Sequence, residues 1–326
     1  MKQRMLGRTN LKVSEIGFGA WAIGGSWGTQ REEDSLAALH KALDLGVNFI
    51  DTAAGYGDGR SERIIGRVLK ERGDRDRVIV TTKTPPAPGP WPPSPYCRWE
   101  DRYSEKYLRE NIEERLKNLG TDRLDVLLLH SWTRAWNRDP APLEILKNLQ
   151  KEGKIRCFGI STPEHDQNAL VGLMRDGWLD AVEVIYNIFE QEPAAELLPA
   201  AAENNVGVIA RMPFDESALT GKLTGQTRFE EGDFRNNYFM GDRLKRTVAQ
   251  VKKVQEDLSG SGYTLPQAAL KFVLAHPSVS TSIPGMRNVG QVEANLAVSE
   301  MPDMPEELLK TLHKHNWRRA FWYEGR

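Results

Sequence analysis

The stretch VNFIDTAAGYGDGRSERIIGRVLKERGDRDRVIVTTK, residues 47–83, predicts a strand, a helix and a second strand in that order. The apolar run 47–50 is short and bounded by turn residues, which is typical of a strand buried on both faces. Residues 61–73 carry apolar side chains at helical spacing, between a serine that can cap a helix and a glycine that can end one. Residues 77–81 are again apolar and β-branched. One β–α–β unit with parallel strands is therefore expected here.

The same alternation of short apolar runs and helical patterns recurs along most of the chain. With residues 15–18 as the first strand, eight β–α units result, which predicts an α/β fold of the (β/α)8 or TIM-barrel class. We expect a single domain over residues 1–326, with an N-terminal β-hairpin at 1–14, a long loop at 84–103 and extra C-terminal helices. The other predicted strands are 124–129, 156–160, 180–185, 206–210 and 278–283. The other predicted helices are 31–46, 104–119, 140–153, 164–176, 194–205, 242–259, 264–276, 288–298 and one within 305–326.

The alternative fold is an open, doubly wound sheet, which would need a glycine fingerprint after its first strand. GFGAWA, residues 17–22, fits the pattern G-x-G-x-x-A. A helix should open inside that motif, but WAIGGSWGTQ follows, and no helical pattern begins before Arg31. We therefore interpret this segment as a glycine-rich loop after the first strand.

Composition excludes several classes of function. The chain has 326 residues, is 40% hydrophobic and 27% charged, and carries a net charge of −1, which gives no basis for binding nucleic acid or an anionic membrane. No apolar run approaches the ~20 residues of a transmembrane helix, and MKQRMLGRTN lacks the apolar core of a signal peptide, so a cytoplasmic protein is expected. Cys97 and Cys157 are too few for a disulfide framework or a cysteine zinc site, and no metal site is predicted. We expect a monomer or a weak homo-oligomer.

Polar residues follow several of the predicted strands, and a TIM barrel carries its chemistry at that end of the strands. Asp51, Lys83 and His130 end three adjacent strands, and Tyr56 follows Asp51 on a glycine-rich loop. Each residue alone has an ordinary explanation as a turn residue, an ion pair or a hydrogen-bonded histidine. Together at one end of one barrel they predict a site. Residues at the ends of the later strands are Ser161, Tyr186, Asn187 and Arg211.

The four residues form a chemically sensible set. A tyrosine has an ordinary pKa of ~10, and a nearby ammonium lowers that pKa by stabilising the phenolate. Lys83 supplies the ammonium, and Asp51 anchors it and limits the cost of burying its charge. His130 can donate a hydrogen bond to the oxygen that Tyr56 protonates. Such a set suits protonation of a carbonyl oxygen while a hydride reaches its carbon.

These residues resemble the catalytic tetrad of the aldo-keto reductases. The resemblance implies an NADPH-dependent oxidoreductase that reduces aldehydes and ketones to alcohols by hydride transfer, with Tyr56 as general acid. It further implies a small-molecule carbonyl substrate and a preference for NADPH over NADH. The motifs that carry it are FIDTAAGYG with Asp51 and Tyr56, VTTK with Lys83, LLLH with His130, and the segments 6–21, 158–162 and 283–288.

The resemblance places the nicotinamide in the barrel mouth, and the phosphates and adenosine along the loops after strands seven and eight. Independently, LTGKLTG at 219–225 is a glycine-containing basic loop, and PGMRN at 284–288 leads into a helix whose free N–H groups can bind an anion. Arg287 is the candidate for the 2′-phosphate, or otherwise a solvated charge at a helix end. The residues expected to bind the cofactor are Gly19, Ala20, Trp21, Asp51, Ser161, Thr162, Glu183, Arg211, Pro213, Leu219, Gly221, Lys222, Gly285, Arg287, Gln291 and Asn295.

Some positions depart from the family pattern. Relatives commonly carry asparagine at Thr162, glutamine at Glu183, an aromatic residue at Arg211 and glutamate at Ala294. Because Glu183 lies in strand six and Arg211 ends strand seven, we predict an ion pair between them, with the guanidinium on the nicotinamide face. The alternative has Glu183 in a polar layer of the barrel and Arg211 in solvent.

Eight of the nine tryptophans lie in segments expected around the barrel mouth, which favours an aromatic pocket for apolar or aryl carbonyls. The alternative is that half of them only pack long loops onto the barrel. The residues expected to contact substrate are Trp21, Tyr56, Trp91 and His130. The other tryptophans of these segments are Trp27, Trp99, Trp132, Trp136, Trp317 and Trp322.

Two other functions remain open at this point. One is an NADP(H)-binding regulatory subunit, like the potassium-channel β-subunits of the same superfamily. The other is an alcohol or sugar dehydrogenase that works in the oxidative direction. The intact tetrad favours an enzyme over a regulatory subunit.

Overall fold

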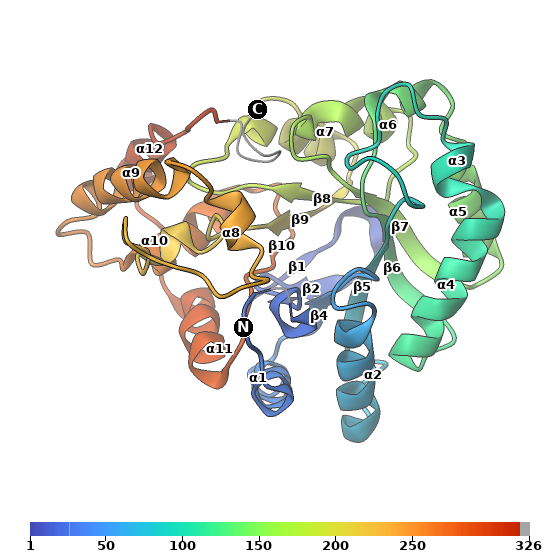
Figure 1. The fold of residues 1–326 in the computed structure, drawn as a ribbon, viewed down its shortest axis with the longest axis horizontal. Helices are drawn as coiled ribbons and strands as arrows, with labels where there is room; N and C mark the ends of the chain where they lie inside the picture. Colours follow the sequence, from blue (N-terminus) through green and yellow to red (C-terminus); the bar gives the residue numbers. More distant parts are fainter. Residues whose placement is uncertain (26, 320–326) are drawn as a thin grey trace.

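The computed structural model describes residues 1–25 and 27–319. Eight parallel strands form one curled sheet in the order β10-β9-β8-β7-β6-β5-β4-β3, with the helices around its outer side (Figure 1). The α/β architecture and the parallel sheet agree with the prediction. The strands are β3 (Phe18–Gly19), β4 (Phe49–Asp51), β5 (Ile79–Thr84), β6 (Leu124–Leu129), β7 (Ile155–Ser161), β8 (Ala181–Ile185), β9 (Gly207–Arg211) and β10 (Thr281–Ser282).

The first and last strands of the sheet also contact each other. Parallel bridges join Ile16 to Ser282 and Gly19 to Gly285. The backbone N–H of Gly19 donates to the oxygen of Pro284 at 3.0 Å. A Cβ atom on Gly19 would lie only 2.6 Å from the carbonyl oxygen of Ile283, so glycine is required for this close approach.

A helix follows each strand, as the β–α pattern predicts. These helices are α1 (Glu32–Asp44), α2 (Arg60–Arg72), α4 (Glu105–Leu119), α5 (Ala141–Lys151), α6 (Val171–Arg175), α7 (Leu197–Glu203), α10 (Leu265–Ala275) and α11 (Val289–Leu296). The additional helices are α3 (Glu100–Tyr103), α8 (Arg235–Tyr238), α9 (Arg243–Asp257) and α12 (Glu306–His313). The helix predicted from residue 164 is wrong at its start. The backbone N–H of Asp166 donates to the oxygen of Pro163 at 3.2 Å and forms a turn in place of the first helical turn.

Side chains alternate between the inside of the curled sheet and its helix-covered outside. Phe49, Val126 and Leu128 belong to an inner cluster, whereas Ile50 and Leu127 belong to the outer one. Both sides of each strand are therefore apolar, as the continuous apolar runs predicted.

The predicted N-terminal hairpin is present, with β1 (Gln3–Met5) paired antiparallel to β2 (Lys12–Ser14). Leu6, Leu11 and Val13 of this hairpin join the inner cluster. Arg8 donates its backbone N–H to Asn205, just before β9 begins. The hairpin therefore covers the end of the sheet where strands start, and the opposite end is left for the site.

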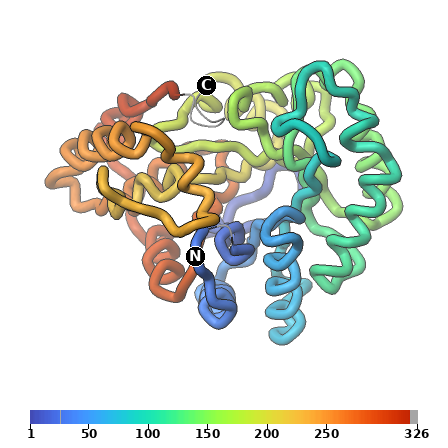
Figure 2. The backbone as a smooth tube through the Cα atoms, in the orientation of Figure 1, coloured from blue at the N-terminus to red at the C-terminus, as the bar shows by residue number. Residues whose placement is uncertain are grey.

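The long connection between β9 and α9 reaches back to the N-terminal segment. The yellow-orange trace in Figure 2 runs beside the blue one, and Glu230 accepts hydrogen bonds from the backbone N–H and the hydroxyl of Thr29 at 2.7 and 3.0 Å. Within the described part of the chain, none of the helices combines the length and apolar character needed to cross a membrane.

Candidate active site

Asp51, Lys83 and Tyr56 meet at the end of the sheet where strands finish. Asp51 is the last residue of β4, and Lys83 lies near the end of β5, the neighbouring strand. The ammonium of Lys83 donates to both carboxylate oxygens of Asp51 at 2.7 Å and to the hydroxyl of Tyr56 at 3.3 Å. Three of the four predicted tetrad residues are thus in direct contact.

Two glycines explain how Tyr56 reaches this position. Gly57 has a φ of +63°, and a Cβ atom there would overlap the carbonyl oxygen of Gly24 in the loop after β3. A Cβ atom on Gly24 would in turn lie 2.6 Å from the carbonyl carbon of Tyr56. The two loops therefore pack backbone against backbone. Trp21 then stacks on the Tyr56 ring at a centroid distance of 6.1 Å.

His130 completes the tetrad from the end of β6. Its backbone N–H donates to the oxygen of Thr84 at 2.9 Å, and its ring meets that of Tyr56 edge-on at 6.1 Å between centroids. Although part of the residue stays accessible, burial of the ring holds the pKa of His130 well below its ordinary value, and the charges of Lys83 and Arg211 lower it further. The imidazole is therefore neutral at pH 7 and keeps one N–H to donate.

The pKa of Tyr56 departs from the prediction. Burial of the phenol raises its pKa above the ordinary value, and this effect outweighs the lowering by Lys83. Asp51 and Glu183 add to the rise because negative charges disfavour the phenolate. The sign of the Lys83 contribution is as expected, but the expectation of a net lowered pKa is wrong.

A second carboxylate contacts Lys83, which the sequence analysis did not predict. Oε2 of Glu183 lies 3.1 Å from the lysine Nζ, and both side chains are at most 1% exposed. Burial lowers the pKa of Lys83, but Asp51 and Glu183 raise it by more, so the net pKa lies above its ordinary value. The alternation of side chains along a strand could have predicted this contact. Lys83 lies four residues after the inward-facing Ile79, and Glu183 lies two residues after the inward-facing Ala181, so both side chains face the inside of the sheet.

The predicted pair of Glu183 and Arg211 is present. The Nε of Arg211 lies 3.7 Å from Oε1 of Glu183, and its Nη2 donates to the backbone oxygen of Thr162 at 3.2 Å. Glu164, which the sequence analysis did not single out, lies 3.5 Å from the same guanidinium. Among the described residues, the buried Nε of Arg211 has no hydrogen-bond partner, whereas Oε2 of Glu183 is paired with Lys83. Nε of Arg211 can therefore interact with a polar ligand group.

Other predicted cofactor residues surround this charged group. Ser161 donates its hydroxyl to Oε1 of Glu183 at 3.1 Å, and Ala20 donates its backbone N–H to the backbone oxygen of Asp51 at 2.9 Å. In the loop after β9 the side chain of Leu219 is buried in the core, whereas Lys222 is exposed. The remaining predicted positions lie on the same loops and strand ends: Gly19, Trp21, Thr162, Pro213, Gly221 and Gly285.

Arg287 makes structural contacts of its own. Its Nε donates to Oε1 of Gln30 at 2.8 Å, and its Nη2 donates to the backbone oxygen of Thr29 at 2.6 Å. Its backbone N–H donates to Oε1 of Gln291 at 2.8 Å. Arg287 is therefore more than a solvated charge, since it links the start of α11 to the loop after β3. Asn295, one turn beyond Gln291, is buried.

Only some of the tryptophans lie near the tetrad. Trp91 meets His130 edge-on at 5.6 Å between ring centroids and is 45% exposed. Trp132 and Trp136 are buried, and the indole N–H of Trp136 donates to the oxygen of Cys97 at 2.8 Å. Trp136 thus joins the loop 130–139 to the loop 84–103, and the indole N–H of Trp132 donates to Asn137 within its own loop, so the broad aromatic pocket is not formed from all the predicted residues. Trp322 lies outside the described residues.

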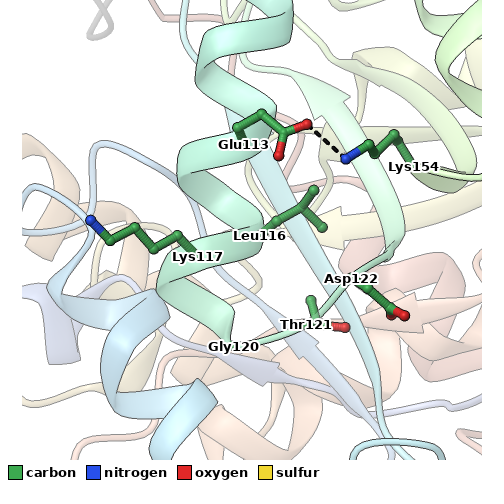
Figure 3. Close-up of a pocket in the computed structure, with 7 residues that line it drawn as sticks. All are labelled: Glu113, Leu116, Lys117, Gly120, Thr121, Asp122 and Lys154. Carbon is green, nitrogen blue, oxygen red and sulfur yellow. Dashed lines mark ion pairs between the residues drawn. The ribbon is translucent and has the colours of Figure 1, made fainter.

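Two surface pockets, each of about 480 Å³, lie away from this site. The first is lined by residues around the end of α4, where Glu113 pairs with Lys154 at 2.8 Å (Figure 3). The second lies against the N-terminal hairpin. Both face the end where strands begin, which in TIM barrels serves stability rather than catalysis. We assign neither pocket to the chemistry.

A curled parallel sheet with a lysine, an aspartate, a tyrosine and a histidine at its carboxyl end defines an oxidoreductase class. The sequence profile of the Aldo/keto reductase family matches residues 15–316. The chain belongs to the aldo-keto reductase family, whose enzymes use nicotinamide cofactors and act on small-molecule carbonyl substrates.

Individual relatives agree with this assignment. The chain is 32% identical over 302 residues to aldo-keto reductase YhdN of Bacillus subtilis (strain 168), covering 90% of this chain and 87% of that protein. It is 29% identical over 316 residues to the NADH-specific methylglyoxal reductase of Escherichia coli (strain K12), covering 91% and 93%. The holo structure of the aldo-keto reductase AKR11C1 from Bacillus halodurans superposes with a TM-score of 0.76 at 27% identity, covering 99% of both chains.

Proposed function

We propose that this protein is an NADPH-dependent carbonyl reductase in which Tyr56 is the general acid. The observation that carries the proposal is the contact of the Tyr56 hydroxyl with Lys83, at 3.3 Å, beside a neutral His130. The proposal takes the curled sheet as a closed (β/α)8 barrel, because bridges join its two edge strands. The tetrad then lies in the barrel mouth.

The residues present fit a nicotinamide cofactor. The buried Nε of Arg211 lacks a hydrogen-bond partner among the described residues, and Ser161 lies beside Glu183. These residues would hold the nicotinamide. Leu219 to Lys222 would hold the phosphates, and Arg287, Gln291 and Asn295 the adenosine. When bound, the reduced cofactor supplies the hydride.

Residues of this chain supply the proton that reduction of a carbonyl requires. The substrate carbonyl accepts hydrogen bonds from Tyr56 and His130, which polarise it and orient its carbon. As the hydride adds to that carbon, the phenol proton passes to the carbonyl oxygen, which leaves an alcohol and a Tyr56 phenolate. Lys83 stabilises that phenolate, and Asp51 keeps the ammonium in place. The raised pKa of Tyr56 means that the phenol is the favoured state at neutral pH, so the residue holds a proton that it can donate.

The preference for NADPH rests on Arg287, whose guanidinium suits a 2′-phosphate. Its Nε and Nη2 are engaged with the loop after β3, so the phosphate would have to use the remaining donors. Because the similar methylglyoxal reductase of Escherichia coli is NADH-specific, the preference of this protein has to be measured. For the substrate, Trp21 and Trp91 flank the tetrad and favour an apolar or aryl carbonyl.

The test is a panel of aldehydes, ketones and sugars assayed with NADPH and NADH in both directions, with Tyr56→Phe as the variant. We expect reduction of at least one carbonyl class, and a loss of roughly 10²–10⁴-fold in Tyr56→Phe with nucleotide binding nearly unchanged. Tyr96→Phe is the matched control, because Tyr96 is 95% exposed. A Tyr56→Phe enzyme that retains most of its turnover overturns the assignment of the general acid.

A further inference from the structure

Glu183 occupies an unusual position in the site. Its carboxylate is 1% exposed and lies 3.1 Å from the ammonium of Lys83. Its other oxygen lies 3.7 Å from Arg211 and accepts a hydrogen bond from Ser161 at 3.1 Å. Glu183 therefore links the proton-donating half of the site, at Lys83, to the half where we place the nicotinamide.

Glu183 balances a positive charge of the site. Asp51 and Glu183 supply two carboxylates, and Lys83 and Arg211 supply two cations, so these four groups sum to zero when all are ionised. Without the charge of Glu183 the same group carries +1, which disfavours a ligand that brings a positive charge.

The pKa of Asp51 shows that the charge of Glu183 reaches neighbouring groups. Burial raises the pKa of Asp51 well above its ordinary value, and the neighbouring Glu183 raises it further, while Lys83 lowers it. The negative charge of Glu183 therefore acts on its neighbours across this buried site.

We propose that Glu183 sets the preference of this site for the redox state of its cofactor, by stabilising the cationic oxidised nicotinamide relative to the neutral reduced ring. The inference rests on the proposed function, which places the ring beside Ser161 and Arg211. Because Ser161 is hydrogen-bonded to Glu183, a ring in contact with Ser161 lies within a few ångströms of the carboxylate. At such distances an ion interaction in a protein interior stays substantial.

The consequence is a shift in the potential of the bound cofactor. Tighter binding of the oxidised form relative to the reduced form lowers that potential, by about 30 mV for each tenfold change in the affinity ratio of a two-electron couple. Arg211 opposes the effect through its own positive charge. Glu183 thus offsets the guanidinium next to a ring that becomes cationic.

The experiment measures the dissociation constants of NADP⁺ and NADPH by titration calorimetry for the wild type, Glu183→Gln and Glu164→Gln. Glu183→Gln keeps the size of the side chain and removes its charge. We expect it to raise the ratio Kd(NADP⁺)/Kd(NADPH) at least fivefold. Glu164→Gln removes the same charge from a side chain that contacts Nη2 of Arg211 and is 19% exposed, so it is expected to change the ratio less than twofold.

A ratio in Glu183→Gln within twofold of the wild-type value overturns the inference, as does an equal shift in Glu164→Gln. Glu183→Ala is a second variant that removes the charge without adding an amide, and it must shift the ratio in the same direction. Circular dichroism confirms that each variant is folded. If the wild type binds neither nucleotide, the proposed function fails. If it binds both and the ratio does not respond to Glu183, only this inference fails.

Discussion

The ammonium of Lys83 lies 2.7 Å from each carboxylate oxygen of Asp51, in a place where neither side chain is more than 3% exposed. Removing one partner of such a buried pair is costly, because the other charge stays buried without compensation. The same ammonium stabilises the Tyr56 phenolate, so Lys83 links stability to catalysis.

Lys83→Met is therefore expected to lower carbonyl reduction by at least about 10²-fold, since the phenolate loses its cation. It should also lower the free energy of unfolding by roughly 3–5 kcal/mol, because Asp51 and Glu183 are left as adjacent buried carboxylates. The measurements are kcat/KM and thermal unfolding. Lys117→Met, at an exposed position on α4, is the control. Normal turnover in a folded Lys83→Met enzyme contradicts its role.

Arg287→Ala is expected to weaken NADPH binding by roughly 10–100-fold and NADH binding by less than about threefold. The reason is the loss of a charge-assisted contact to the 2′-phosphate, worth about 1.5–3 kcal/mol. Nucleotide titrations with both cofactors measure this difference.

Gln30→Ala separates that effect from a structural one, because it removes the Gln30–Arg287 hydrogen bond and leaves the guanidinium charge. We expect it to affect the two cofactors equally. If Arg287→Ala also weakens both equally, Arg287 orders the loop after β3 and does not read the phosphate.

Glu183 and Arg211 are expected to be energetically coupled, since Nε of Arg211 lies 3.7 Å from Oε1 of Glu183. A double-mutant cycle with Glu183→Gln and Arg211→Tyr should give a coupling of about 0.5 kcal/mol or more in NADPH affinity and in thermal stability. Strictly additive effects would mean that each residue acts independently. Glu164 contacts the same guanidinium and can partly replace Glu183 as a counter-ion, which lowers the coupling energy between Glu183 and Arg211.

Glu216→Gln is expected to stabilise the protein at pH 8 and to have little effect at pH 5. Burial and the neighbouring Asp215 raise the pKa of Glu216 to about 8, although Arg211, Arg235 and Arg319 lower it. Below the ordinary value of 4.5 the group is protonated in both folded and unfolded chains. Between that value and about 8 only the unfolded chain ionises, so stability falls as the pH rises through this window.

Each pKa unit corresponds to about 1.4 kcal/mol, so a shift from 4.5 to about 8 gives a penalty at pH 8 on the order of 4–5 kcal/mol. Thermal unfolding of wild type and variant across this pH range measures it. Glu231→Gln, an exposed substitution in the same connection, is the control. A Glu216→Gln variant with the same gain at pH 5 and pH 8 contradicts the assignment.

Much of the fold follows from local pattern. The strand 124–129 was predicted with the bounds that β6 has, because its apolar residues are continuous and both faces of the strand are buried. The helix predicted at 164–176 was wrong at its start, since Pro163 and Asp166 form a turn that helical periodicity does not report. The charged side chains at strand ends were identified by position alone, because the carboxyl ends of parallel strands meet at one end of the sheet.

The sequence by itself determined the β–α repeat, the hairpin, the four tetrad residues and the pairing of Glu183 with Arg211, because each of these depends on spacing along the chain or on neighbouring strands. Only the tertiary structure decided that Lys83 is shared between Asp51 and Glu183, which come from strands β4 and β8 on different sides of β5. It also decided the direction in which the pKa of Tyr56 moves. Both depend on distances across the interior and on the exclusion of water, and burial outweighs a single nearby charge there.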